Sequence, residues 1–125
     1  MKTLSKKIIA AGFAAALLAT PTLALAQDSY GAIAYSPSTG SYGWAHDFGS
    51  QSAAENAALD SCYDRANDCQ VAVWFRNACG ALAVGPNGWG AAWAVKQRKA
   101  RRDAVDACSG YSSNCQVAYS LCSPN

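Results

Sequence analysis

The feature that most constrains the fold of this chain is an internal repeat. Three short motifs occur twice in the same order: G-A-(I/L)-A at residues 31–34 and 80–83, W-A at 44–45 and 93–94, and C-Q-V-A at 69–72 and 115–118. Ordered matches at several places are difficult to obtain by chance. We therefore interpret the chain as two copies of one unit, covering about residues 30–77 and 78–121.

Each copy predicts the same order of elements, ββαβ. The predicted strands lie at 32–35, 42–46 and 70–75 in the first copy and at 89–95 and 116–121 in the second, where the repeated G-A-L-A at 80–83 marks the remaining strand. Turns rich in proline and glycine separate the first two strands of each copy. The predicted helices carry alanine and cysteine faces, Ala54, Ala58 and Cys62 in one copy and Ala100, Ala104 and Cys108 in the other. Ser52 and Glu55 have capping-box spacing. This order predicts an α+β fold with antiparallel sheet and pseudo-twofold symmetry.

The six cysteines are the second constraint on the fold. In a small exported chain they are most simply three disulfides, with zinc or redox chemistry as the alternatives. The same six-residue gap separates Cys62 from Cys69 and Cys108 from Cys115, so these pairs are predicted and Cys79 remains for Cys122. Tyr30 and Arg76 hold the equivalent positions in the first copy and are expected to stack. The spacing lacks a zinc knuckle, and no cysteine is left over, so we expect no metal and no cofactor.

The first 26 residues are typical of a secretory signal peptide. Lys2, Lys6 and Lys7 precede an apolar run over residues 8–25, and A-L-A at 24–26 predicts cleavage before Gln27. No later segment is apolar for long enough to span a bilayer. We therefore expect one duplicated domain at residues 27–125 that is periplasmic or secreted.

The net charge of the chain changes sign when this segment is left out. The whole chain carries +2, but the mature chain has seven basic and eight acidic residues, a net charge of −1. This balance excludes a generally basic nucleic-acid binder, and the signal peptide excludes a cytosolic enzyme. The charge is also uneven. Residues 27–78 have two basic and six acidic residues, and residues 79–125 have five basic and two acidic residues.

The Y-G-A-I-A start at residues 30–34, the C-Q-V-A run at 69–72, the small exported size and the paired cysteines resemble a bacterial family of exported domains, domain-of-unknown-function family 4189. The resemblance covers nearly the whole mature chain. It implies an exported bacterial protein of α+β type. The motifs that carry it are structural, and the family supplies no catalytic residues to transfer.

The strongest candidate for a binding site is a run of five cations, Lys96, Arg98, Lys99, Arg101 and Arg102. On a helical wheel, Arg98, Lys99 and Arg102 lie opposite the alanine face. They occupy the first turns of the helix, where the macrodipole disfavours positive charge, although Asp103 and Asp106 can pair with Lys99 and Arg102. An anion-binding patch for acidic glycans, lipid head groups or an acidic protein is one interpretation. A solvated helix face is the other.

Aromatic residues form a second candidate. Tyr35, Tyr42, Trp44, Trp89 and Trp93 cluster about the two predicted hairpins, where an exposed row could stack on sugar rings or bind a partner's loop. We expect Trp44, Trp74 and Trp93 to lie in the core, with Trp44 and Trp93 in equivalent places. Trp89 is flanked by glycines, and the sequence leaves open whether its side chain is exposed or buried.

A catalytic set is the least supported candidate. His46 is the only histidine, and strand alternation predicts that His46 and Asp47 point to opposite faces. A structural, hydrogen-bonded histidine is expected, and no nucleophile or hydrolase motif is present. The leading hypothesis is an exported, non-catalytic binding module for a protein or cell-envelope component, for example an inhibitor or immunity-type protein. The alternative is a small periplasmic hydrolase acting on envelope polymers through His46 and a carboxylate.

Overall fold

A computed structural model describes residues 27–124, and the predicted signal peptide at 1–26 lies outside the described residues. The elements follow the chain in the order β1 (Tyr30–Tyr35), β2 (Tyr42–Phe48), α2 (Gln51–Tyr63), β3 (Gln70–Arg76), β4 (Ala78–Gly85), β5 (Gly88–Ala94), α3 (Gln97–Ser109) and β6 (Gln116–Ser123). The predicted α+β fold with a duplicated ββαβ unit is therefore confirmed.

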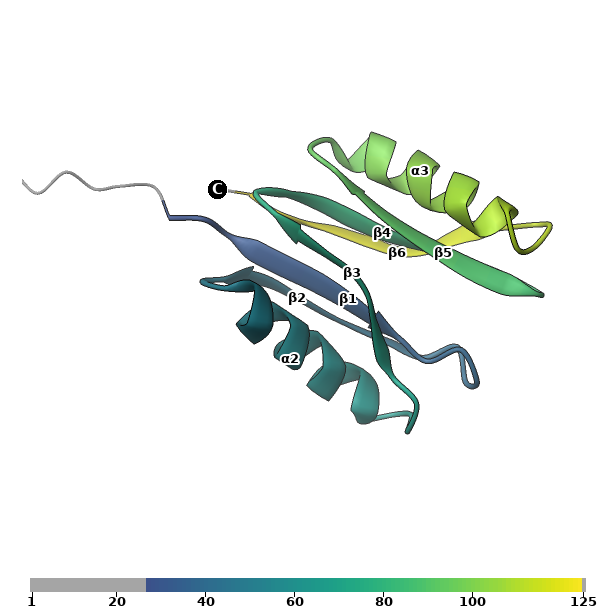
Figure 1. Ribbon diagram of the computed structural model, residues 1–125, viewed down its shortest axis with the longest axis horizontal. Helices are drawn as coiled ribbons and strands as arrows, with labels where there is room; N and C mark the ends of the chain where they lie inside the picture. Colours follow the sequence, from purple (N-terminus) through teal and green to yellow (C-terminus); the bar gives the residue numbers. More distant parts are fainter. Residues whose placement is uncertain (1–26, 125) are drawn as a thin grey trace, which may run out of the picture.

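Each unit forms its own three-stranded antiparallel sheet. The first strand of the unit lies in the middle, giving the orders β2-β1-β3 and β5-β4-β6. Helix α2 covers one sheet and α3 covers the other, and the uncovered faces of the sheets pack together. The result is a sandwich with a helix on each outer side, seen at the bottom and the top of Figure 1.

Small side chains allow each helix to lie close to its sheet. Ala54, Ala58 and Cys62 of α2 are fully buried against β1 and β2. A Cβ atom on Gly43 would collide with the backbone of α2, and one on Gly90 would collide with the backbone of α3. The close approach predicted from the alanine-rich helix faces is therefore present in both units.

Larger apolar side chains fill the space between the two sheets. Ile33, Leu82 and Leu121 are buried there together with Phe75, the largest fully buried side chain. The Phe75 ring lies against Gly31 of β1, and against the equivalent glycine of β4, where no Cβ atom could fit. The central core thus joins both units around one ring.

Hairpin length shifts the register between the two copies. Ile33 of β1 lies opposite Trp44, whereas its counterpart Leu82 lies opposite Ala91. Trp93 lies opposite Gly80. The prediction that Trp44 and Trp93 hold equivalent places is therefore wrong by two residues, because the loop between β4 and β5 is shorter than the loop between β1 and β2.

Three disulfides link the chain as the repeat predicts. Two of them join a helix end to the segment before the following strand, at Cys62–Cys69 and Cys108–Cys115. Cys79–Cys122 joins residues that lie opposite each other on β4 and β6. No cysteine within residues 27–124 is free. In the first unit, Tyr30 and Arg76 occupy the equivalent opposed positions, and a side-chain hydrogen bond to Tyr30 raises the pKa of Arg76.

The two helices begin in different ways. Ser50 is the N-cap of α2, and its hydroxyl accepts a hydrogen bond of 3.2 Å from the Ala53 amide. The predicted capping box at Ser52 and Glu55 is therefore wrong, because the helix begins two residues earlier than the hydrophobic pattern indicated. Helix α3 begins after Lys96, which supplies no side-chain cap.

Candidate functional site

The outer face of α3 is densely basic. Its inner positions, Ala100, Ala104 and Cys108, are fully buried against the sheet. With these residues facing inward, the cations of the helix and its N-cap remain in solvent: Lys96, Arg98, Lys99, Arg101 and Arg102. We call these five residues the basic face. The structure therefore brings Arg98, Lys99 and Arg102 onto one exposed surface, while their binding role stays a prediction.

Few acidic side chains neutralise the basic face. Lys99 donates to Asp103 at 2.6 Å, as the spacing predicts. Among residues 27–124 no ion pair joins Arg102 to Asp106, so the second anticipated pair is not formed. The first turn of α3 contains no acidic residue. Within the described part of the chain, Lys96 and Arg98 are thus without an acidic partner at the N-terminus of α3, where the macrodipole disfavours positive charge, and Arg101 and Arg102 are without one in the next turn.

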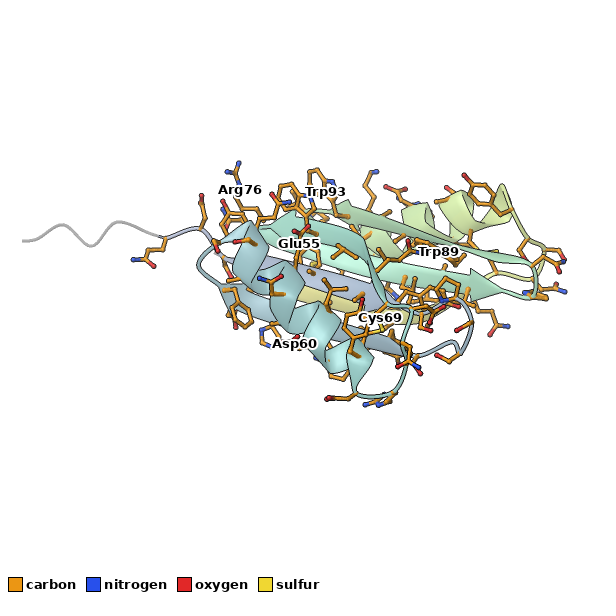
Figure 2. The ribbon with its side chains drawn as sticks, turned by 60° about the horizontal axis from the view of Figure 1, so that its bottom comes forward. Glu55, Asp60, Cys69, Arg76, Trp89 and Trp93 are labelled. Carbon is orange, nitrogen blue, oxygen red and sulfur yellow. A yellow bond between two sulfur atoms is a disulfide. The ribbon has the colours of Figure 1, made fainter. Side chains whose placement is uncertain are left out.

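The opposite outer face of the sandwich carries acidic residues. On α2, Asp60 and the C-cap Asp64 are exposed and Glu55 is half-buried, and Figure 2 shows Asp60 on this helix. Because α2 and α3 cover opposite sides of the paired sheets, the charge asymmetry read from the sequence separates in space (Figure 1). An anionic partner therefore meets an attractive field on only one side of the molecule.

The side chains of His46 and Asp47 lie together instead of on opposite faces. Asp47 has a φ of 65°, which breaks the alternation of β2 at its last residues. The Nδ1 atom of His46 lies 2.8 Å from Asp47 Oδ2. The prediction of opposite faces is therefore wrong, whereas the hydrogen-bonded histidine that we expected is present.

Two serines complete a polar cluster around Asp47. Ser29 Oγ donates to Asp47 Oδ1 at 3.1 Å, and the Asp47 amide donates to Ser123 Oγ at 2.7 Å. The hydrogen bonds from His46 and then Ser29 lower the pKa of Asp47. In a nucleophilic triad the histidine lies between serine and carboxylate. Here the carboxylate lies between the histidine and the serine, and the cluster connects the residue before β1 to β2 and β6.

A second acidic residue orders the β1–β2 loop. The buried Ser36 hydroxyl donates to Asp68, and the Ser38 amide donates to Asp68 Oδ2 at 3.2 Å. Hydrogen bonds from Ser36 and then Ser38 lower the pKa of Asp68. The Asp68 carboxylate thereby connects the loop before β3 to the loop after β1.

Asp68→Asn should make folding stability less sensitive to acid. Because the folded-state pKa of Asp68 is lowered, its carboxylate contributes stability above the unfolded pKa of about 3.9 and loses it as the pH falls through the folded pKa. Urea unfolding at a series of pH values from 5 to 2 measures this slope. Asp60→Asn, on the exposed face of α2, is the control. Equal slopes for wild type and Asp68→Asn would contradict this role.

Three tryptophans predicted to be buried lie at the surface instead. Their exposed fractions are 37% for Trp44, 41% for Trp74 and 58% for Trp93. They lie on β2, β3 and β5, which are edge strands of their sheets. Alternation in the sequence predicts which face of a strand a side chain occupies. It does not predict that the strand lies at the edge of a sheet, where part of either face remains in solvent. Trp89 is half-buried, between the two alternatives that the sequence left open.

Trp89 borders a pocket that the sequence did not reveal. The pocket has a volume of about 700 Å³ and lies at the β4–β5 hairpin, with Tyr35, Trp89 and Tyr111 in its lining. A second hollow of about 430 Å³ is lined by Trp93 and by residues 73–76 of β3. Both hollows lie between β3 and β5, and Figure 2 shows Trp89 and Trp93 along this side of the molecule. No sequence pattern predicts that β3 and β5 lie close together, because they belong to different units.

Two further findings concern metals and membranes. Within the part of the chain that the structure describes, no group of three or more histidine, cysteine or acidic residues could hold a metal ion. None of the described helices is both long and apolar enough to cross a membrane. The three disulfides are typical of proteins outside the reducing cytosol.

The fold and its surfaces define a small α+β domain, linked by disulfides, with one basic and one acidic outer face. The chain belongs to the family described as Domain of unknown function (DUF4189), whose model matches residues 30–122. The resemblance inferred from the sequence motifs is therefore confirmed.

The chain is also similar to three curated mycobacterial proteins. They are Protein Rv1269c and Protein MT1307 of Mycobacterium tuberculosis and Protein Mb1300c of Mycobacterium bovis. Each is 48% identical over 59 residues, which cover 47% of this chain and 44% of the relative. The matched segment thus spans less than half of each relative. No solved structure matches this chain.

Proposed function

We propose that this protein is an exported, non-catalytic module that binds an anionic component of the cell envelope, or an acidic protein, through the basic face. The observation that carries the proposal is the exposure of five cations around the first turns of α3, with a single acidic partner among the described residues. In this proposal, residues 1–26 are removed on export, and residues 27–125 form the periplasmic or secreted domain.

The energetics of α3 support a functional role for these cations. A helix N-terminus without a side-chain cap or an acidic first turn disfavours positive charge by a few tenths of a kcal/mol per residue in solvent. Local preferences that conflict with the fold are expected at functional sites. Helix α2, which has the same place in the duplicated unit, has a serine cap and an acidic outer face. The two helices have the same place in the repeated unit but opposite charge, which supports a functional role for the positive charge on α3.

The scaffold suits binding by a rigid surface. The disulfides Cys79–Cys122 and Cys108–Cys115 fix β6 and the end of α3 relative to the sheet. A surface that is already ordered loses less conformational entropy when a partner binds. An inhibitor or immunity-type protein would use such a surface. The hydrolase alternative receives less support, because Ser29 bonds to Asp47 and not to His46.

Replacing Arg98, Lys99 and Arg102 together with alanine should weaken binding to an anionic surface. Each cation near such a surface contributes about 1 kcal/mol, so the loss should be about two orders of magnitude in affinity. The midpoint salt concentration for elution from heparin, used as a polyanion probe, measures this loss. The matched control exchanges arginine for lysine and lysine for arginine at the same three positions, which keeps the charge.

The control should elute near the wild type, because charge and not side-chain shape carries the interaction. The alanine variant should have a thermal midpoint equal to or slightly above that of the wild type, since all three side chains are exposed and the N-terminus of α3 disfavours their charge. Elution of the alanine variant at the wild-type salt concentration would remove the basic face from the proposal.

A further inference from the structure

Strand β5 is an edge of its sheet and lacks the usual protection of an edge. Edge strands are commonly protected by charges, prolines or bulges. β5 reads G-W-G-A-A-W-A, without charge or proline, and it pairs with β4 without a register shift. By contrast, β2 carries His46 and Asp47, and β3 and β6 pair with register shifts. The outer main-chain groups of β5 therefore remain available for pairing.

Tyr35 adds a polar group without a partner beside this edge. Its side chain lines the pocket at the β4–β5 hairpin, yet the residue is only 4% exposed. Its ring lies 5.5 Å from that of Trp89, centroid to centroid. Among residues 27–124 no group forms a hydrogen bond with the Tyr35 hydroxyl, and burial raises its pKa. A ligand that hydrogen-bonds to this hydroxyl would supply the partner that none of residues 27–124 supplies.

The composition of the site indicates the class of ligand. The lining of the pocket contains no charged residue, and its polar side-chain groups include the hydroxyls of Tyr35 and Tyr111 and the amide of Asn87. Sugar sites usually require strong acceptors for hydroxyl protons, and no carboxylate lines this pocket. Trp89 and Trp93 lie on the same side of β5, about 13 Å apart along the strand. An extended peptide of about five residues would span the distance between these two tryptophans.

We propose that β5 receives an extended, uncharged peptide segment of a partner protein, which adds as a strand to the sheet. Main-chain hydrogen bonds along the open edge would supply affinity, as in other strand-addition complexes. One polar-tipped side chain of the peptide enters the pocket and bonds to the Tyr35 hydroxyl. This site is separate from the basic face, so either can be correct without the other.

Peptides for the test come from a displayed library of random dodecapeptides selected on the wild-type domain, and the tightest binder is the probe. Binding of this peptide should protect the amides of residues 88–94 from hydrogen exchange. Tyr35→Phe should weaken binding about 2- to 10-fold, the range expected for one hydrogen bond. Tyr63→Phe, at a hydroxyl that donates to the Cys69 carbonyl at 3.0 Å, is the matched control and should bind as the wild type.

Trp93→Lys, at a side chain of β5 that is 58% exposed, places a charge beside the open edge and should reduce binding at least 10-fold while leaving the thermal midpoint within a few degrees. The alanine variant of the basic face should bind the peptide normally, which separates this proposal from the previous one. Selected peptides that protect other elements, or equal binding by Tyr35→Phe and the wild type, would overturn the proposal. Protection of β5 that rises with protein concentration alone would overturn it in favour of a second copy of this chain.

Discussion

Phe75→Ala is expected to lower the free energy of unfolding by about 3 to 5 kcal/mol. Phe75 is the largest fully buried side chain, and its ring fills the space beside Gly31 and Gly80. Neither glycine has a side chain that could move into the vacated volume. Because small domains have only about 5–15 kcal/mol of stability, this change should bring the protein close to unfolding at 37 °C.

Phe48→Ala is the matched control for the central core. Phe48 is the last residue of β2 and is exposed. Urea unfolding followed by tryptophan fluorescence should give a loss below about 1 kcal/mol for this variant. Similar losses for the two variants would contradict the conclusion that one ring joins the two sheets.

Replacement of both Cys79 and Cys122 with alanine should have the second largest effect on stability. This disulfide closes a segment with a sequence separation of 43 residues. In the chain-entropy model its loss costs about 4 kcal/mol, because the unfolded chain gains the freedom of the opened loop. The bond also connects the middle strand β4 to the last strand β6, so the C-terminal strand should fray first.

The short disulfides provide an internal comparison. Cys62 and Cys69 have a sequence separation of seven, and the same model gives a cost of about 2.4 kcal/mol for their replacement. Denaturant unfolding of both double-alanine variants under identical conditions measures the difference. A smaller loss for the long-loop pair than for the short-loop pair would contradict this ranking.

The repeat predicts most of the fold because its signals are local. Element order follows from alternation and helical spacing, and the disulfides follow from the equal gap after Cys62 and Cys108. Register is not local. The loop between β4 and β5 is shorter than its counterpart, so Ala91 takes the place of Trp44, which no comparison of the two copies in sequence predicts.

The candidate sites differ in the same way. The basic face could be predicted because Ala100 and Ala104 determine the inner side of α3 and hence the outer side. The pocket could not, because Tyr35 and Trp89 belong to different units and meet only when the two sheets pack. Asp47 was misplaced for a third reason. Its positive φ occurs together with hydrogen bonds to Ser29 and Ser123, which lie far away in the sequence.

The most direct test of the proposed function is a map of amide chemical shifts during titration with a heparin oligosaccharide. We expect the largest changes at residues 96–103, on and just before the first turns of α3, and we expect them to shrink as salt is added. Changes concentrated on α2, or on the side of the molecule formed by β3 and β5, would contradict the assignment of anion binding to the basic face.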